Sequence, residues 1–325
     1  MHSINQAKNL YGKSAASNRP LPTEIVPMNQ AGSGQPIFWI HAAAGGSSVG
    51  QYQRFADVSQ RPFYAIKPPT IDIAHYWLWG LEARACYYTA LITSIDPIGP
   101  YDLGGYSMGC TLAYEVARQL LALGRKVQSL VLIDPTDMAC VQQWAQAHDS
   151  SLVGLQSLLL RTLNFSLLSD SWDTGQDSPV VFIHRDDVMG YNSIDTFMER
   201  LMELGHQRGL KLSREQFMFR VIQDRQLLNS LVCEGYNQPL PAPNDLNGFL
   251  FINRSGAMQG ACAPYILMDD SLAGAVEKHY NAEWLTQCSA FKHYELETTS
   301  HFMLLFESHA LLPCVRLCET LYRVS

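Results

Sequence analysis

Two short segments of this chain consist mostly of consecutive apolar residues. They are 36–41 (PIFWIH) and 128–133 (QSLVLI), and helical patterns alternate with further strand patterns between them. A strand that is apolar on both faces is buried on both faces, which is typical of a parallel sheet covered by helices. The sequence therefore predicts an α/β protein with a mostly parallel sheet.

Predicted strands and helices alternate along the first 135 residues. Strands are predicted over 24–28, 36–41, 63–66, 101–105 and 128–133, and helices over 50–58, 81–95 and 110–123. The last of these helices carries a regular apolar stripe and is followed by Gly124, a typical residue just past a helix end. Such alternation with short connections places helices on both faces of the sheet.

Residues from about 138 to 245 interrupt this alternation. The stretch has a mostly helical pattern, clearest over 152–168 and 196–204, and ends in a cluster of prolines at 239, 241 and 243. Strand patterns return at 248–252 and 291–296, and a final helix is predicted over 310–322. We expect a single domain over residues 23–325 with a helical cap, or lid, formed by 138–245. Residues 1–22 are polar and are expected to be a flexible leader or linker.

The motif Gly105-Tyr106-Ser107-Met108-Gly109 lies between a predicted strand and a predicted helix. This GxSxG pattern forms a turn so tight that side chains at the glycine positions would collide, and the turn exposes the serine hydroxyl. The following helix N-terminus offers backbone N–H groups to a developing oxyanion. Ser107 is therefore the candidate nucleophile and the Met108 N–H a candidate oxyanion donor; a chance match is the weaker interpretation because of the flanking elements.

A serine nucleophile needs a base, and the base needs an acid to orient it. Asp134 ends the next predicted strand, at the same sheet edge as Ser107, and is the leading acid. The other position used in such folds follows the next core strand, where Asn253-Arg254 offers no carboxylate. Asp137 is the second choice for the acid.

Ten histidines are available as the base, and position in the predicted fold selects among them. His301 follows the strand 291–296 in the last loop at the carboxyl edge of the sheet, where a base would lie over the nucleophile. His293 is inside that strand and His309 is in the next helix, so both are expected to be packing or surface residues. The order Ser107, Asp134, His301 completes a catalytic triad.

The second oxyanion donor is expected from the loop after the strand 36–41. This loop reads HAAAGGSS over 41–48, with small residues that let the backbone approach a ligand. We assign the donor to the Ala43 N–H, with Ala44 as second choice. The lysine of a phosphate-binding loop is missing, so the glycines do not indicate a nucleotide site.

Composition excludes several classes of partner. Twenty-three basic against thirty acidic residues leave a formal net charge of -7, which does not favour nucleic acid. No uninterrupted apolar stretch reaches the roughly 20 residues of a membrane span, and the polar start does not resemble a signal peptide, so the sequence predicts a cytoplasmic protein without a membrane partner.

Eight scattered cysteines predict reduced, core-filling thiols. Cys314 and Cys318 with His309 have a metal-like spacing, but a packing stripe is preferred; no metal and no cofactor are predicted.

The residues 24–135, together with SHFMLL at 300–305, resemble the type I thioesterase domains of polyketide and nonribosomal peptide synthases, within the α/β-hydrolase fold. The resemblance is carried by PIFWIHAAAGGSS, RPFYAIKPP, GPYDLGGYSMG, LAYEVARQLLALG and SLVLIDP. It implies that Ser107 accepts an acyl chain from the phosphopantetheine arm of an acyl carrier protein, with Asp134 and His301 as acid and base. Hydrolysis or macrocyclisation would then release a polyketide or polyketide-peptide chain.

The chain departs from the family pattern at two places. The usual HPAGG reads HAAAGG, and the glycine-aspartate before the catalytic histidine is replaced by Thr299-Ser300. Three other functions stay open: a carboxylesterase or lipase acting on a free ester, a standalone proofreading thioesterase, and a non-catalytic binding module. The length of the cap favours chain release, and the presence of all three triad residues makes the binding module the weakest alternative.

Overall fold

The computed structural model describes residues 20–42, 49–69, 78–147, 150–174, 180–231, 236, 238–256, 263–269, 280–298, 300–305 and 307–324. Seven strands form one sheet in the order β1-β3-β2-β4-β5-β6-β7. β1 pairs antiparallel with β3, and every other neighbouring pair is parallel. The predicted mostly parallel sheet is confirmed.

The strands are β1 (Ile25–Asn29), β2 (Ile37–Ile40), β3 (Phe63–Ile66), β4 (Tyr101–Tyr106), β5 (Val127–Ile133), β6 (Asn247–Asn253) and β7 (Lys292–Leu296). The α-helices are α2 (Gln53–Asp57), α3 (Leu81–Ile95), α4 (Met108–Ala122), α5 (Met138–Ala147), α6 (Leu152–Thr174), α7 (Ile194–Gln207), α8 (Arg214–Leu231), α9 (Ala263–Ile266), α10 (Ala282–Gln287) and α11 (Ser308–Leu321). Two short 3-10 helices, η1 (Gly50–Tyr52) and η3 (Arg185–Val188), complete the described elements.

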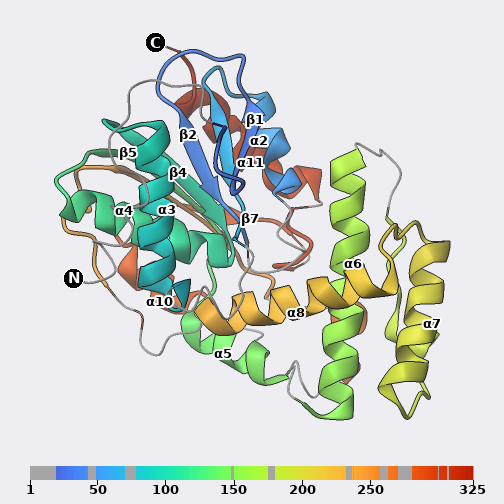
Figure 1. Cartoon of the computed structure of the whole chain (residues 1–325). Helices are drawn as coiled ribbons and strands as arrows, with labels where there is room; N and C mark the ends of the chain where they lie inside the picture. Colours follow the sequence, from blue (N-terminus) through green and yellow to red (C-terminus); the bar gives the residue numbers. More distant parts are fainter. Residues whose placement is uncertain are drawn as a thin grey trace.

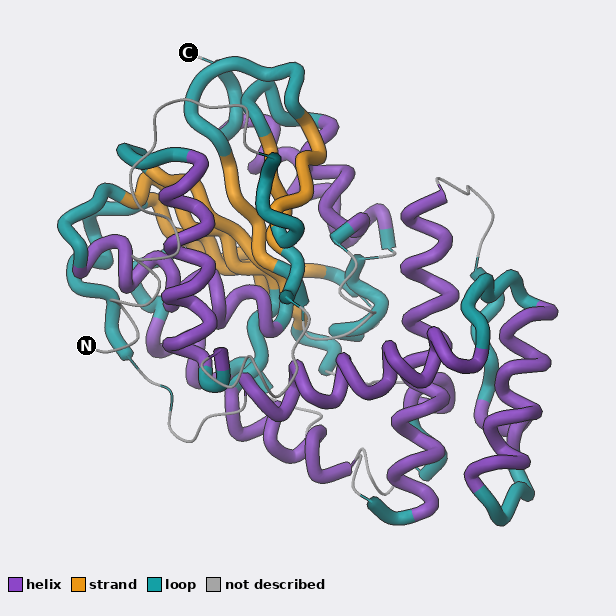
Figure 2. Tube along the Cα trace, in the orientation of Figure 1, coloured by secondary structure: helices purple, strands orange, loops and turns teal. Residues whose placement is uncertain are grey.

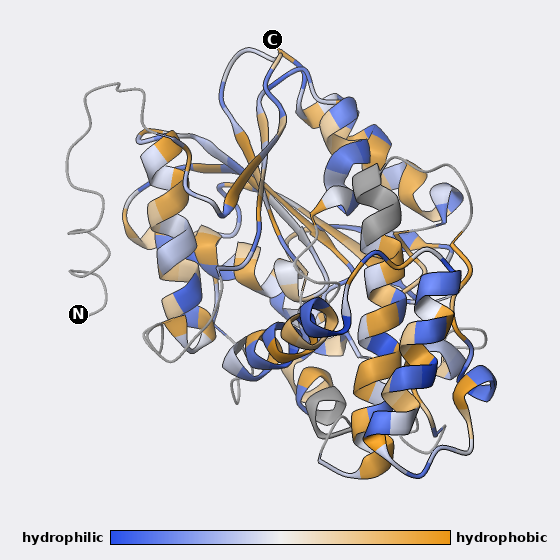
Figure 3. Ribbon diagram, turned by 45° about the vertical axis from the view of Figure 1, so that its right-hand side comes forward, coloured by the Kyte–Doolittle hydropathy of each residue, from blue (hydrophilic) through white to orange (hydrophobic). Residues whose placement is uncertain are grey.

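Helices cover both faces of the sheet, as the sequence predicts (Figure 1). The apolar sides of α3 and α4 pack on one face, in a core cluster that includes Leu91, Leu112 and Leu132. On the other face α2 and α11 contribute Phe55 and Leu311 to a second cluster. Apolar and polar residues alternate around these helices, and the central strands are largely apolar (Figure 3).

The predicted elements agree with the structure at most boundaries, and β3 and α3 coincide with their predicted ranges. Two differences are informative. α4 begins at Met108 rather than at 110, because the helix starts directly after the tight turn at Ser107. The sequence does not predict the range of α8. Its solvent side carries the exposed apolar residues Phe219 and Ile222, so apolar residues do not recur on one face of the helix only.

The helices α5 to α8 form an insertion between β5 and β6, and α6, α7 and α8 lie to one side of the sheet (Figures 1 and 2). The insertion has its own apolar cluster, to which α6 contributes Leu163, α7 contributes Leu201 and α8 contributes Phe217. Leu227 and Leu228, near the end of α8, instead join the core cluster of the sheet. α8 therefore connects the insertion to the rest of the fold.

Within the described residues, one window in α6, Leu152–Ser169, is long and apolar enough to cross a membrane by length and composition alone. Of the residues in this window, 78% are buried inside the protein. The core of the insertion accounts for these apolar residues, since α6 packs against α7 and α8 there.

Candidate active site

The turn that carries the candidate nucleophile joins β4 to α4. Ser107 has φ 57° and ψ −128°, and its backbone N–H donates to the Ile133 carbonyl at 3.0 Å. A Cβ on Gly105 would lie 2.3 Å from the Gly109 carbonyl oxygen, and one on Gly109 would lie 2.4 Å from the Ile40 carbonyl oxygen. Both glycines are therefore required by close backbone packing, which is the steric reason for the motif.

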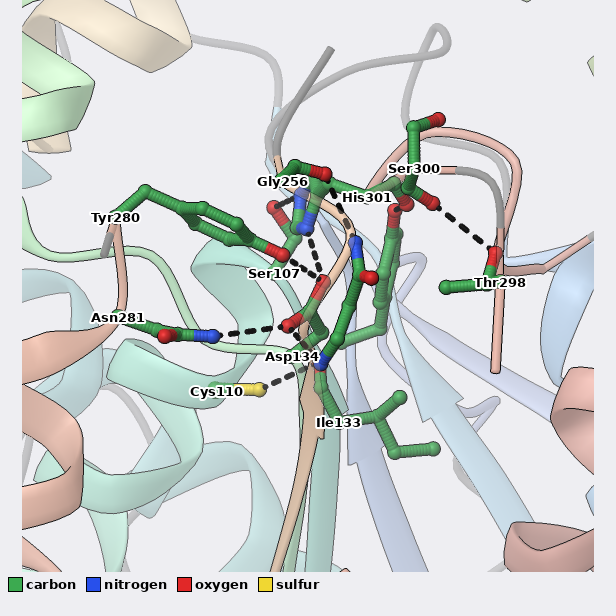
Figure 4. A network of polar contacts seen from close by, with 12 residues as sticks. Ser107, Cys110, Ile133, Asp134, Gly256, Tyr280, Asn281, Thr298, Ser300 and His301 are labelled. Atoms are coloured by element: carbon green, nitrogen blue, oxygen red, sulfur yellow. Dashed lines mark hydrogen bonds and ion pairs between the residues drawn. The ribbon is translucent and has the colours of Figure 1, made fainter. Parts of the chain in front are cut away.

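Ser107, His301 and Asp134 form a continuous chain of hydrogen bonds (Figure 4). The Ser107 Oγ lies 2.8 Å from His301 Nε2, and His301 Nδ1 lies 2.8 Å from Asp134 Oδ2. Because the carboxylate can only accept, His301 donates from Nδ1, and its Nε2 accepts from the serine. Asp137 is placed elsewhere: its Oδ2 accepts from the Glu283 N–H at 3.1 Å.

Asp134 is fully buried, and four donors surround its carboxylate. In addition to His301, Oδ2 accepts from the Tyr280 hydroxyl at 2.5 Å. Oδ1 accepts from the backbone N–H of Asn253 at 3.0 Å and from the side-chain amide of Asn281 at 3.2 Å. These donors replace the water that a buried carboxylate loses, and charged groups are retained in protein interiors only with such compensation.

Aromatic rings enclose the imidazole of His301. Tyr106 stacks on it with ring centroids 5.0 Å apart, while Tyr280 and Phe302 contact it edge-on at 5.6 and 5.2 Å. The Tyr106 hydroxyl also donates to the His301 carbonyl, and the His301 N–H donates to the Gly256 carbonyl at 3.2 Å. The ring is therefore held from several sides and is only 1% exposed.

Ser300, the residue before His301, takes part in several local hydrogen bonds. The Ser300 hydroxyl accepts from the Met303 N–H at 3.2 Å, and the Ser300 carbonyl accepts from Thr298 Oγ1 and from the Leu304 N–H, both at 3.2 Å. Ser300 is fully buried. These contacts fix the turn that carries His301 in a chain that has serine in place of the family's aspartate.

The sequence profile of the thioesterase domain family matches residues 35–321. This chain belongs to the thioesterase domain family. The sequence is 32% identical over 300 positions to polyketide synthase PksR of Bacillus subtilis (strain 168). The aligned region covers 92% of this chain and 11% of that protein. It is also 40% identical over 105 positions to the non-reducing polyketide synthase ntnG of a Nectria species, in an aligned region that covers 32% of this chain and 5% of that protein.

The thioesterase domain thus spans about a tenth or less of these curated relatives. Among solved structures it resembles holo-AB3403, a four-domain nonribosomal peptide synthetase bound to AMP and glycine, with a TM-score of 0.64 and 17% identity. That match covers 99% of this chain and 23% of the synthetase chain, and it supports the fold. The predicted α/β-hydrolase architecture and the predicted family are both confirmed.

The candidate oxyanion donors of the thioesterase domain are only partly described. Met108 is the first residue of α4, so its N–H is among those with no partner inside the helix. Ala43 and Ala44 lie outside the described residues. Just before them, His41 Nδ1 donates to the Ala42 carbonyl and the Tyr88 hydroxyl donates to His41 Nε2, both at 2.7 Å. Burial lowers the pKa of His41 to about 3, so the ring is neutral and can make both bonds.

Sequence reasoning missed several residues that contact the candidate triad, including Tyr106, Asn253, Tyr280 and Asn281. Tyr106 lies inside the serine motif, and Asn253 occupies the alternative acid position, so both had a signal in the sequence. Tyr280 and Asn281 had none, because they follow Asp134 by more than 140 residues and lie in no motif.

Cys314 and Cys318 face inward from α11 and are buried in the apolar cluster of the second sheet face. His309 lies on the exposed side of the same helix. The two thiols are therefore packing residues, as the sequence predicts. Among the residues that the structure describes, no group of three His, Cys, Asp or Glu side chains could hold a metal ion.

Proposed function

We propose that this thioesterase domain releases an acyl chain from a carrier protein through an acyl-serine intermediate on Ser107. The observation that carries the proposal is the hydrogen-bonded series Ser107, His301 and Asp134. As Oγ attacks the thioester carbonyl, His301 Nε2 accepts its proton, and Asp134 stabilises the imidazolium that forms. The thiol then leaves with a proton from His301, and the acyl group stays on Ser107.

Backbone N–H groups stabilise the tetrahedral intermediate in this proposal. The Met108 N–H, at the start of α4, is the first donor, and the helix dipole adds to its effect. The Ala43 N–H is proposed as the second, with Ala44 as the alternative. Removing one oxyanion donor typically raises the barrier by about 2.7–4 kcal/mol.

A second attack clears the acyl-serine. Water gives a linear acid, whereas a hydroxyl or amine of the bound chain gives a ring, and His301 removes the proton of either nucleophile. The similarity to polyketide and nonribosomal peptide synthases supports a polyketide or polyketide-peptide chain, delivered on the phosphopantetheine arm of an acyl carrier protein or upstream module. Every proton transfer uses side chains of this chain, so no cofactor of its own enters the scheme.

The domain organisation belongs to the same proposal. Residues 23–325 act as one domain, and the insertion 138–245 acts as a lid that contributes to substrate choice. The contact of α8 with α3 and with the core cluster supports this assignment, because it joins the insertion to the helical layer that covers the sheet. The free buried thiols, such as Cys314 and Cys318, fit the reducing cytoplasm where carrier proteins work.

Intact-protein mass spectrometry with acyl-pantetheine thioesters tests the function. The wild type is expected to gain one acyl group, and Ser107→Ala is expected to gain none. Product analysis then separates linear acids from rings. Equal or faster turnover of matched oxygen esters would indicate a carboxylesterase, and failure of the wild type to react with any ester or with a fluorophosphonate would overturn the proposal.

A further inference from the structure

We infer that Tyr280 and Asn281 are positioning residues that set the orientation and charge distribution of Asp134, and through it the readiness of His301 to accept a proton. The inference rests on the proposed function, since it concerns the same triad. Both side chains donate to the acid, and the Tyr280 ring also contacts His301 edge-on.

The two residues are held against the turn that carries Asp134. The Tyr280 carbonyl accepts from the Asp137 N–H at 2.6 Å, and the Asp137 carboxylate accepts from the Glu283 N–H at 3.1 Å. The Trp284 indole donates to the Thr136 carbonyl at 3.2 Å. Three bonds therefore fix the segment 280–284 on the turn after β5, so the side chains at 280 and 281 face the carboxylate from a rigid base (Figure 4).

Tyr280 and His301 donate to the same carboxylate oxygen. The Tyr280 hydroxyl lies 2.5 Å from Asp134 Oδ2, and His301 Nδ1 lies 2.8 Å from it. Each donor draws negative charge from that oxygen, so the tyrosine weakens the attraction of Asp134 for the imidazolium. Burial and the negative charge of Asp134 raise the pKa of Tyr280 far above its ordinary value, so the hydroxyl keeps its proton and remains a donor.

Asn281 acts on the other oxygen. Its side chain donates to Oδ1 at 3.2 Å, beside the backbone N–H of Asn253 at 3.0 Å. Because the backbone donor remains when Asn281 is replaced, the effect of Asn281 is expected to be smaller than that of Tyr280. A role in charge distribution predicts a smaller effect at Asn281 than at Tyr280, whereas general packing predicts no such order.

Tyr280→Phe is the direct test, because it removes the hydroxyl and retains the ring that contacts His301. Without this donor, Oδ2 attracts the imidazolium more strongly, so His301 becomes easier to protonate. The acid limb of the pH profile of kcat/KM is expected to move to higher pH by about half a unit or more. Because the carboxylate also loses a hydrogen bond that orients it toward His301, the kcat at the plateau is expected to fall about tenfold, with KM within about twofold of the wild type.

Two further variants calibrate the measurement. Asn281→Leu is expected to move the acid limb in the same direction by less than Tyr280→Phe does. Tyr101→Phe also removes a buried tyrosine hydroxyl, one that donates to the Asp96 carbonyl at 2.9 Å away from the triad, and is expected to leave the pH profile unchanged. The downfield proton resonance of His301 Nδ1–H should shift in Tyr280→Phe and stay in place in Tyr101→Phe, provided that both variants have wild-type circular dichroism.

The outcomes distinguish the inference from the proposed function. If wild type forms the acyl-serine but Tyr280→Phe keeps the wild-type acid limb and Nδ1 resonance, the positioning role is wrong and the function stands. If the acid limb moves to lower pH, the charge argument is wrong in sign and the inference is overturned. If wild type forms no acyl-serine with any thioester, the proposed function fails, and the resonance alone then decides whether Tyr280 acts on the Asp134–His301 pair.

Discussion

Ser107 and Asp134 both have a positive φ angle, which L-amino acids rarely adopt. Their φ angles are 57° and 51°, and among the described residues they are the two non-glycine positions with positive φ. They follow the neighbouring parallel strands β4 and β5, and the Ser107 N–H bonds the carbonyl of Ile133, the residue before Asp134. Each such residue typically stores about 1–3 kcal/mol, which the surrounding core must offset.

Ser107→Gly is expected to be more stable than Ser107→Ala by about 1 kcal/mol. Glycine adopts a positive φ without the steric cost of a Cβ, so the usual preference for alanine reverses at this turn. Both variants should lose acylation. Denaturant unfolding at neutral pH measures the difference, and an alanine variant that is equally stable or more stable would show that the turn is not strained.

Gly109→Ala is expected to destabilise the protein by about 3 kcal/mol or more. Its Cβ would meet the backbone oxygens of Ile40 and His41 at 2.4 and 2.7 Å, and backbone cannot easily move aside. Gly124→Ala provides the control: Gly124 has φ 71° and open space around it, so only about 1 kcal/mol should be lost. Similar losses at the two sites in thermal or denaturant unfolding would contradict the packing argument.

Tyr106→Phe is expected to lower kcat severalfold, and Tyr106→Leu to lower it further. Phenylalanine loses the hydrogen bond to the His301 carbonyl but keeps the stacked ring, whereas leucine loses both. KM should change little, because Tyr106 holds the base rather than the acyl chain. Steady-state kinetics with one acyl-pantetheine substrate checks both constants, and losses that appear in KM rather than in kcat would indicate a binding role instead.

Asp134→Asn is expected to lower kcat by about 10³–10⁴-fold, because an amide cannot stabilise the imidazolium. Asp137→Asn should remain within about threefold of wild type, since Asp137 bonds the Glu283 N–H and not the histidine. Single-turnover acylation compares the two variants. A severe loss in Asp137→Asn with an active Asp134→Asn would assign the acid to the second choice.

The buried His41 is expected to make stability depend on pH. Burial lowers its pKa from 6.5 to about 3, so between these values the unfolded chain binds a proton that the folded protein does not. The contribution of His41 to the free energy of unfolding is fully present above about pH 6.5 and is lost as the pH falls below that value. Between pH 7 and 5 the loss is about 2 kcal/mol. His41→Gln should lose correspondingly less over that range in urea unfolding.

Asp137 should act in the opposite direction in the same experiment. Burial raises its pKa from 3.8 to about 6, so the folded protein binds the extra proton, and this group favours folding as the pH falls from about 6 to 4. Asp137→Asn should therefore steepen the loss of stability between pH 7 and 5 by about 1 kcal/mol. A flatter profile in this variant would contradict the direction of the shift.

Local pattern was enough to predict the elements around the nucleophile. Buried strands are apolar on both faces, amphipathic helices repeat every three to four residues, and a turn between them requires glycines at 105 and 109. These are short-range properties, so they predicted β2 to β5 and the positions of Ser107, Asp134 and His301 at one sheet edge. The helix α8 was harder, because Phe219 and Ile222 lie on its solvent side.

The sequence by itself thus determined the α/β-hydrolase fold, the thioesterase family and the candidate nucleophile, acid and base. Only the tertiary structure decided which groups surround that acid. Tyr280 and Asn281 reach Asp134 across more than 140 residues of chain, and Ser300 orders a loop in place of the family's aspartate. The physical reason is that a buried carboxylate needs donors from whatever segment packs beside it, and long-range packing leaves no periodic trace in a sequence.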